Sequence, residues 1–232
     1  MKSLYLILDL GSMAIPFIFS FHSKIKFNRY FKSVFIGIAL TMAIFIPWDV
    51  YFTQHGFWGF NDQYLIGKRL LGLPIEEWLF FICIPFACIF THFCLTKFYP
   101  GIKLSSNTTR NLTIGIIIIS AILCLLNTSR AYTFTNYLYA VILLSFTLIK
   151  FPTILQQFYL TFIVILLPFF VVNGLLTGSA IESQVVWYNN EENLGIRLLT
   201  IPVEDIMYAF TMLLTCYIPV HIRRTQKPLH KT

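Results

Sequence analysis

Seven long apolar runs, separated by short polar segments, make up most of this chain. A run of roughly 18 or more apolar residues with few charges is typical of a helix that crosses a bilayer. The pattern therefore predicts an all-α membrane protein with seven transmembrane helices. We predict spans at residues 4–21, 33–52, 75–95, 111–127, 131–149, 155–176 and 203–222. The first run is interpreted as a retained helix, because no small-residue cleavage pattern follows it.

The composition agrees with this pattern. Hydrophobic residues make up 57% of the chain, charged residues make up 12%, and the mean hydropathy is +0.73. In soluble domains about a quarter of the residues are charged, twice the fraction found here, so a soluble fold is excluded. All five cysteines lie inside apolar runs without metal-ligand spacing: Cys83, Cys88, Cys94, Cys124 and Cys216. We interpret them as packing residues and predict no metal site.

Lysine and arginine are divided unevenly between the segments that join the predicted spans. Five lie on one side: Lys2, Lys68, Arg69, Arg130 and Arg197. Twelve lie on the other: Lys24, Lys26, Arg29, Lys32, Lys97, Lys103, Arg110, Lys150, Arg223, Arg224, Lys227 and Lys231. Because cytoplasmic segments carry the excess, we predict an inner (plasma) membrane protein with its N-terminus outside and its C-terminus in the cytoplasm. The net charge of +7 then faces anionic lipid, and we expect the bilayer rather than nucleic acid as its partner.

The chain contains an internal repeat. Residues 68–77 (KRLLGLPIEE) align with residues 196–205 (IRLLTIPVED) at an offset of 128. The matching pairs are Arg69 and Arg197, Pro74 and Pro202, Glu76 and Glu204, Glu77 and Asp205, and, further upstream, Asn61 and Asn189. Weaker matches extend the repeat: Tyr5 with Tyr132 and Asp9 with Asn136 at an offset of 127, and Asp49 with Asn173 at 124.

The repeat predicts the domain organisation. Spans 1–3 correspond to spans 5–7, and the fourth span is a connector. We therefore predict a first repeat at 1–100, a connector helix at 101–128 and a second repeat at 129–232. With one connecting helix the two repeats run parallel and are related by an axis along the membrane normal. Both acidic pairs then lie at the same membrane face.

The repeated acidic pair admits two interpretations. Proline and acidic residues suit the start of a helix, which is a purely structural explanation. Carboxyls inside a membrane are costly, however, and usually mark a site. We take Glu76, Glu77, Glu204 and Asp205 as catalytic acid/base candidates, with Glu76 and Glu204 preferred as facing the centre. The supporting candidates are Asp9, Asp49, Asn136, Asn173, Asn61 and Asn189, together with Arg69 and Arg197, which we expect to hold one carboxylate of each pair ionised.

Aromatic residues gather near the acidic pairs. The chain has 24 Phe, 12 Tyr and 4 Trp, many of which fit interface belts or lipid-facing positions. Aromatic faces also stabilise cations. An acid together with such faces would suit protonation of an alkene in a lipid-soluble substrate. The predicted substrate-binding residues are Trp48, Trp78, Phe80, Phe81 and Tyr208.

These residues resemble a known family, the membrane-integral lycopene cyclases of the heterodimeric type, with both subunits fused in one chain. The resemblance lies in RLLGLPIEEWLFF (69–81), RLLTIPVEDIMYAF (197–210) and the Trp48–Asp49 pair, and it covers essentially the whole chain. It implies redox-neutral cyclisation of the ends of lycopene, a lipid-soluble carotenoid, giving β-carotene via γ-carotene. It also implies that Glu76, Glu77, Glu204 and Asp205 supply acid and base, and that other carotenoid-pathway enzymes are partners. Loss of the proton from a different carbon would give an ε-ring instead.

Other function classes fit less well. A retinal protein needs a lysine in its last span, and 203–222 has none. A membrane prenyltransferase needs aspartate-rich motifs, and a flavin-dependent cyclase needs a dinucleotide fingerprint, neither of which is found. We therefore expect no cofactor. A proton-coupled transporter or a carotenoid- or retinoid-binding membrane protein stays open as the alternative, because parallel repeats and buried carboxyls also occur in transporters.

Overall fold

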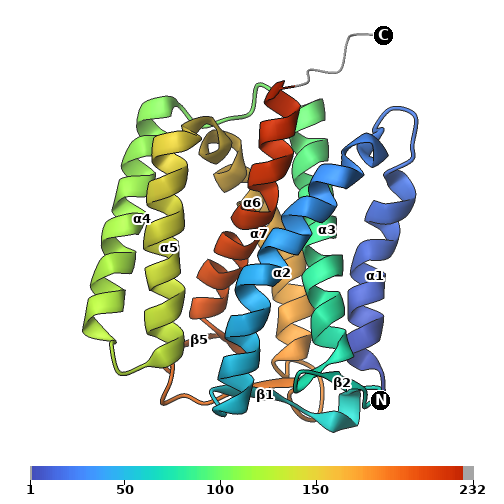
Figure 1. The fold of residues 1–232 in the computed structure, drawn as a ribbon, viewed down its shortest axis with the longest axis vertical. Coiled ribbons are helices and arrows are strands. Elements are labelled where there is room, and N and C mark those ends of the chain that lie inside the picture. The colour runs from blue at the N-terminus through green and yellow to red at the C-terminus, as the bar shows by residue number, and fades with distance from the viewer. Residues whose placement is uncertain (1, 227–232) are drawn as a thin grey trace.

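The computed structural model describes residues 2–226, which form a bundle of long helices with short strands at one end (Figure 1). The α-helices of this part of the chain are α1 (Leu4–Phe19), α2 (Phe31–Gln54), α3 (Ile75–Phe98), α4 (Ser106–Leu126), α5 (Ala131–Lys150), α6 (Pro152–Leu176) and α7 (Glu204–Gln226). A 3₁₀ turn (η1, Phe27–Tyr30) precedes α2 and another (η2, Asp62–Tyr64) follows it. The helices α2 and α3 begin and end within three residues of the predicted spans 33–52 and 75–95.

Six of the helices in the described residues are long and apolar enough to cross a membrane. The structure is thus mostly helical, as expected of a multi-pass all-α membrane protein. The helix α1 differs, because its 16 residues rise only about 24 Å, less than the roughly 30 Å of a hydrocarbon core. The start of α4 was predicted five residues too late. The sequence of its first turn is polar and therefore typical of a loop. In the structure the Ser105 hydroxyl accepts a hydrogen bond from the Thr108 amide at 3.1 Å and caps the helix.

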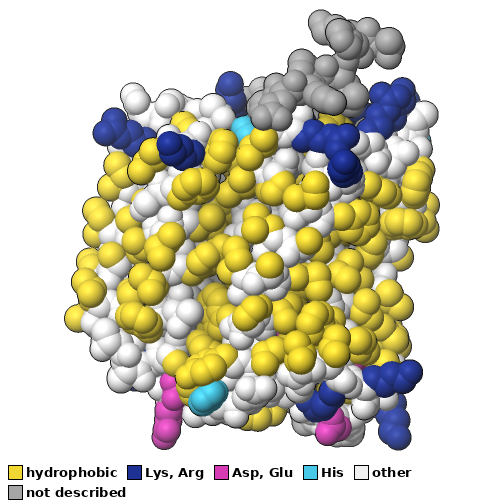
Figure 2. All heavy atoms as spheres, viewed as in Figure 1, with side chains coloured by type: hydrophobic (Ala, Val, Ile, Leu, Met, Phe, Trp, Pro, Cys, Tyr) yellow, Lys and Arg dark blue, Asp and Glu magenta, His cyan; other side chains and the backbone are white. Residues whose placement is uncertain are grey.

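The surface agrees with a membrane setting. A broad hydrophobic band separates two charged ends, and on the face shown in Figure 2 the acidic side chains lie only at the end that carries the strands. Residues on the helices such as Leu167 and Ile149 are about three-quarters exposed, with values of 72% and 75%. Water would disfavour so much exposed apolar area, whereas lipid would not. The predicted cytoplasmic Lys227 and Lys231 lie outside the described residues.

The helices pack in a characteristic set of pairs. The most extensive contacts join α4 to α5, α2 to α7, and α1 to α3. The α2–α7 pair is close because Gly37 lies against the α7 backbone. A Cβ atom at Gly37 would approach the Cys216 carbonyl oxygen to 2.1 Å. Only a residue without a side chain fits there.

The short strands form three pairs beside the starts of α3 and α7. One hairpin consists of β2 (Arg69–Leu70) and β3 (Leu73–Pro74), and its counterpart of β5 (Arg197–Leu198) and β6 (Ile201–Pro202). The third pair joins β1 (Trp58–Phe60) to β4 (Val186–Tyr188), one from each half of the chain.

The hydrogen bonds beside the β1–β4 pair are reciprocal. The Asn61 amide donates to the Val185 carbonyl at 2.9 Å, and the Asn189 amide donates to the Phe57 carbonyl at 2.8 Å. Asn61 and Asn189, like Phe57 and Val185, are 128 positions apart, so each half gives the other the same contact. This reciprocity is the mark of a local two-fold relation between the two loops.

We predict that Gly37→Ala lowers the stability of the bundle by about 1–3 kcal/mol, since the added methyl group forces α2 away from α7. Thermal unfolding of the purified protein in detergent measures this as a lower midpoint temperature. Gly115→Ala in α4 is the matched control, because its Cβ would meet nothing within 4 Å. Equal midpoints for the two variants would contradict the close α2–α7 contact.

Candidate active site

A cavity of about 320 Å³ lies among α1, α3, α6 and α7 and ends against β1 and β4. Most of its lining is apolar, but three carboxyl groups line it: Asp49, Glu77 and Asp205. Their side chains are 1%, 8% and 5% exposed, so water hardly reaches them. Such a pocket, apolar with a few converging polar groups, is typical of a small-molecule site.

Glu77 and Asp49 form the first cluster of the cavity. The Tyr5 hydroxyl donates to Glu77 Oε2 at 2.6 Å, and the Trp58 indole nitrogen donates to Asp49 Oδ1 at 2.6 Å. The two carboxyls lie within hydrogen-bonding reach of each other. Two neighbouring carboxyls hydrogen bond only when one carries a proton, so a pair at this separation can share one.

Asp205 forms the second cluster, which differs from the first. It accepts hydrogen bonds from Tyr132 (2.6 Å), Tyr188 (3.0 Å) and Asn173 (2.9 Å). Three donors and no carboxyl partner suit an ionised carboxylate. Desolvation, together with the Asp205 carboxyl, raises the pKa of Tyr188 in β4 well above its usual range, so the phenol keeps its proton and stays a donor.

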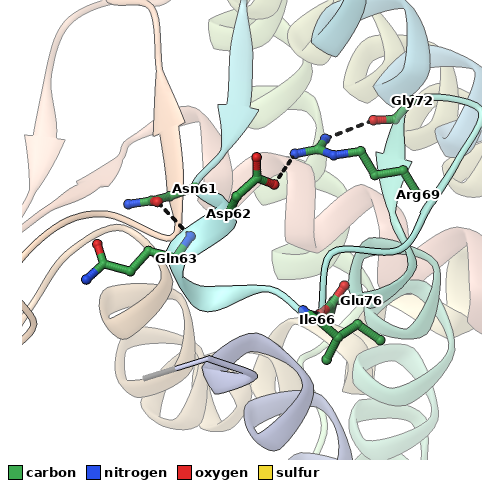
Figure 3. Close-up of polar contacts among 7 residues, drawn as sticks. All are labelled: Asn61, Asp62, Gln63, Ile66, Arg69, Gly72 and Glu76. Atoms are coloured by element: carbon green, nitrogen blue, oxygen red, sulfur yellow. Dashed lines mark hydrogen bonds and ion pairs between the residues drawn. The ribbon is translucent and has the colours of Figure 1, made fainter.

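Glu76 and Glu204 do not line the cavity, so the preference for them as central residues was wrong. Glu76 Oε1 accepts from the Ile66 amide at 2.6 Å, and Glu204 Oε1 accepts from the Leu194 amide at 2.7 Å (Figure 3 shows the first of these). Ile66 and Leu194 are 128 positions apart. These two glutamates therefore tie each loop to the start of the following helix.

Arg69 and Arg197 also act within the loops, and the expectation that they hold a carboxylate of each pair was wrong. Arg69 donates to Asp62 at 2.7 Å and to the Gly72 carbonyl at 3.0 Å (Figure 3). Arg197 donates to Asn190 at 2.8 Å and to the Thr200 carbonyl at 2.9 Å. Each guanidinium group therefore stabilises one hairpin, Arg69 that of β2 and β3 and Arg197 that of β5 and β6.

The asparagines have structural contacts. The Asn61 and Asn189 side chains accept from the amides of Gln63 and Glu191, each at 3.0 Å, and so shape the loops. Asn136 donates to the Glu204 carbonyl at 2.8 Å.

Asp9, the counterpart of Asn136, is fully buried near Glu76 and Glu77. Neither of its oxygens has a hydrogen-bond partner among the described residues. It lies beside the cavity carboxyls without lining the cavity.

The predicted aromatic residues divide into two groups. Phe80 and Tyr208 line the cavity, whereas Trp48, Trp78 and Phe81 do not. The Trp78 indole donates to the Leu70 carbonyl at 3.2 Å, and Phe81 is fully buried in the core. Trp48 meets Tyr208 edge to face, with ring centroids 5.3 Å apart.

The site predicted from the sequence lacked Tyr5, Tyr132 and Tyr188, the phenols that hold the carboxyls. The equivalence of Tyr5 and Tyr132 in the repeat was the signal that could have found the first two. Among residues 2–226, no group of three His, Cys, Asp or Glu side chains is arranged to hold a metal ion.

Comparison of the sequence with known families identifies the family of this chain. The sequence model of one family, described as lycopene cyclase, matches residues 2–95 and 129–222. The chain belongs to the lycopene cyclase family. The two matched segments fall on the two halves of the repeat, and each contains one acidic pair. The family resemblance read from the sequence is thereby confirmed.

Individual relatives match over shorter stretches. A bifunctional lycopene cyclase/phytoene synthase of Neurospora crassa is 40% identical over 47 residues, which are 20% of this chain and 8% of that protein. A bifunctional lycopene cyclase/phytoene synthase of Podospora anserina is 32% identical over 88 residues, 37% of this chain and 14% of that protein. The aligned parts are thus a small share of these longer relatives. No solved structure is significantly similar to the chain.

If Glu77 and Asp49 share a proton, we predict that the infrared spectrum of wild type differs from those of variants at these two residues. Asp49→Asn gives Glu77 an amide neighbour like the one that Asn173 gives Asp205, so we expect Glu77 to ionise. Infrared difference spectra of wild type against Asp49→Asn should show the loss of a protonated-carboxyl C=O band. Glu77→Gln should remove the same band. Spectra with equal carboxylic-acid intensity in all three proteins would contradict a shared proton.

Proposed function

We propose that this protein is a lycopene β-cyclase, which converts the linear ends of lycopene to β-rings and so forms β-carotene via γ-carotene. The observation that carries the proposal is a carboxyl pair able to hold a proton at the end of an apolar cavity. The family match and the names of the relatives support the substrate class. The reaction is an isomerisation, because each ring closure takes up one proton and gives one back.

The first step is protonation of the terminal double bond. The O–H bond of the Glu77–Asp49 pair breaks, a C–H bond forms, and a tertiary carbocation results. General acids of this kind contribute about 10²–10⁴-fold to a rate. Tyr5 and Trp58 donate to Glu77 and Asp49 respectively, which stabilises the carboxylate that remains. Exclusion of water from these residues protects the cation from hydration.

The second step is ring closure beside aromatic faces. The neighbouring double bond attacks the cation, a C–C bond forms, and the positive charge moves into the new ring. Tyr208, Phe80 and Trp58 line the cavity at this depth and present π faces that stabilise the charge. The ionised Asp205, which lines the same cavity, adds electrostatic stabilisation.

The last step is loss of a proton from the ring. Asp205 is the base in this proposal, because its three hydrogen bonds suit a carboxylate and it lines the same cavity. The C–H electrons form the ring double bond. Which carbon loses the proton decides between a β- and an ε-ring, and the β-ring is the product we propose.

The architecture and orientation belong to the same proposal. Residues 1–100 and 129–232 are two parallel repeats, related by an axis along the membrane normal, with 101–128 as the connector. The matched hairpins and the reciprocal Asn61 and Asn189 hydrogen bonds support this arrangement. Together they give seven transmembrane helices, in which the short α1 crosses with the help of its flanking residues.

The membrane and partners are proposed from the charges and the relatives. The excess of Lys and Arg at the end away from the strands supports an outside N-terminus and a cytoplasmic C-terminus in the plasma membrane. Because the relatives are bifunctional with phytoene synthase, other enzymes of carotenoid biosynthesis are the expected protein partners.

The proposal predicts pigment conversion in a bacterium that accumulates lycopene. Expression of the chain should convert lycopene to β-carotene, detected by chromatography of the extracted pigments. Glu77→Gln should lower product by about 100-fold or more, because an amide cannot donate an acidic proton. Unchanged lycopene with wild-type protein present in the membrane would refute the function.

Glu76→Gln is the matched control, one residue away with the same chemical change. Its amide oxygen can still accept from the Ile66 amide, so we expect activity within about tenfold of wild type. If Glu77→Gln kept full activity while Glu76→Gln lost it, the assigned roles of the two glutamates would be reversed.

A further inference from the structure

Two equivalent helix pairs meet where the two halves join, α1 with α6 and α5 with α2, and we call the space between each pair a gap. Neither helix pair is among those that pack extensively. The repeat offsets of 127, 124 and 128 match the residues that border the two gaps. On this matching, Ser12 corresponds to Tyr139, Val172 to Trp48, Phe169 to Phe45, and Phe80 to Tyr208.

The gap between α2 and α5 is filled by aromatic side chains. The Phe45 ring lies 5.4 Å from Tyr139, 5.0 Å from Tyr208 and 5.5 Å from Trp48. The Tyr139 hydroxyl of α5 lies 2.8 Å from Thr215 Oγ1 of α7, and this hydrogen bond holds the Tyr139 ring against α7. The four rings close this side of the bundle.

The gap between α1 and α6 is open. Two large residues of the closed gap, Tyr139 and Trp48, are replaced by Ser12 and Val172, and both of these line the cavity. Both are half-buried, and neither has a ring that could fill the space between α1 and α6. The neighbouring Val171 points outward, with 63% of its side chain exposed.

The cavity is also elongated. Its lining on α3 runs from Glu77 to Thr91, fourteen residues or about 21 Å along a helix. On α6 it runs from Leu176 to Ile165, about 16 Å. One end holds the carboxyls and the other lies deep in the apolar band. An extended apolar chain fits this shape, whereas a compact polar ligand does not.

We propose that a single lateral entrance between α1 and α6 admits the linear polyene from the lipid, and that Ser12 and Val172 keep it open. This inference rests on the proposed cyclase function. The end of the polyene meets Glu77 and Asp49, while the rest of the molecule lies along α3 and α6 and leaves through the gap. The protein therefore has one site rather than two, and the two ends of a symmetric substrate enter one after the other.

The test uses the full chain in lycopene-accumulating bacteria. Val172→Trp introduces the tryptophan that stands at the equivalent position, Trp48, in the gap between α2 and α5. We expect ring formation to fall by about tenfold or more because an indole fills the entrance. Val171→Trp makes the same change one residue away on the lipid-facing side and should behave as wild type. Wild-type activity in both variants would overturn the entrance. An inactive wild type would instead refute the proposed function.

A variant on the other helix of the entrance, α1, and a measurement of stability complete the test. Ser12→Tyr introduces the tyrosine that stands at the equivalent position, Tyr139, and should have the same effect. Leu10→Tyr, on the exposed side of α1, is its control. Purified variants are compared by thermal midpoint and by the lycopene that remains bound, read from its visible absorbance. We expect the two blocked variants to keep their midpoints and lose bound lycopene. Blocked variants that bind lycopene as wild type does would contradict the entrance.

Discussion

The cost of burying carboxyl groups among apolar helices governs the rest of this structure. An unpaired charge inside such a bundle costs several kcal/mol, so each carboxyl needs a hydrogen-bond partner or a proton. Glu76 and Glu204 receive backbone amides from the loops, which fixes those loops over the helix starts. Asp205 receives three donors, whereas Glu77 receives Tyr5, Asp49 receives Trp58, and these two carboxyls lie within hydrogen-bonding reach of each other. The same constraint thus gives three different hydrogen-bond environments for carboxyls within one region, on which the proposed roles rest.

The internal repeat gives two similar halves, and single replacements make them unlike. Asp49 in the first half is Asn173 in the second, so one acidic residue gains a carboxyl neighbour and the other an amide. Trp48 and Val172 differ in a similar way: Trp48 packs on Phe45 and Tyr208 between α2 and α5, whereas Val172 lines the cavity where we propose the entrance. In our proposal, proton donor, proton acceptor and access route belong to one cavity, which residues of both halves line.

Much of the fold could be predicted from the sequence, because apolar runs of membrane length leave few alternatives. The polar first turn of α4 was missed since its cap depends on one hydroxyl, Ser105. The site was found only in part. Repeat alignment located all four acidic residues, but it could not show that Ile66 and Leu194 reach back to Glu76 and Glu204. The arginines were misassigned for a similar reason: Arg69 and Arg197 precede the carboxyls in sequence, yet the hairpins turn them toward Asp62, Asn190 and loop carbonyls.

The central claim is that a buried carboxyl pair gives a proton to an apolar substrate and that a ring proton leaves in exchange. Cyclisation of unlabelled lycopene by membranes equilibrated in D₂O tests it directly, because carboxyl protons exchange with solvent and carbon-bound protons do not. Mass spectrometry should find one deuterium for each ring formed, in a product otherwise isomeric with lycopene. Cyclic product without deuterium, or with a mass that shows oxidation or hydration, would contradict the account.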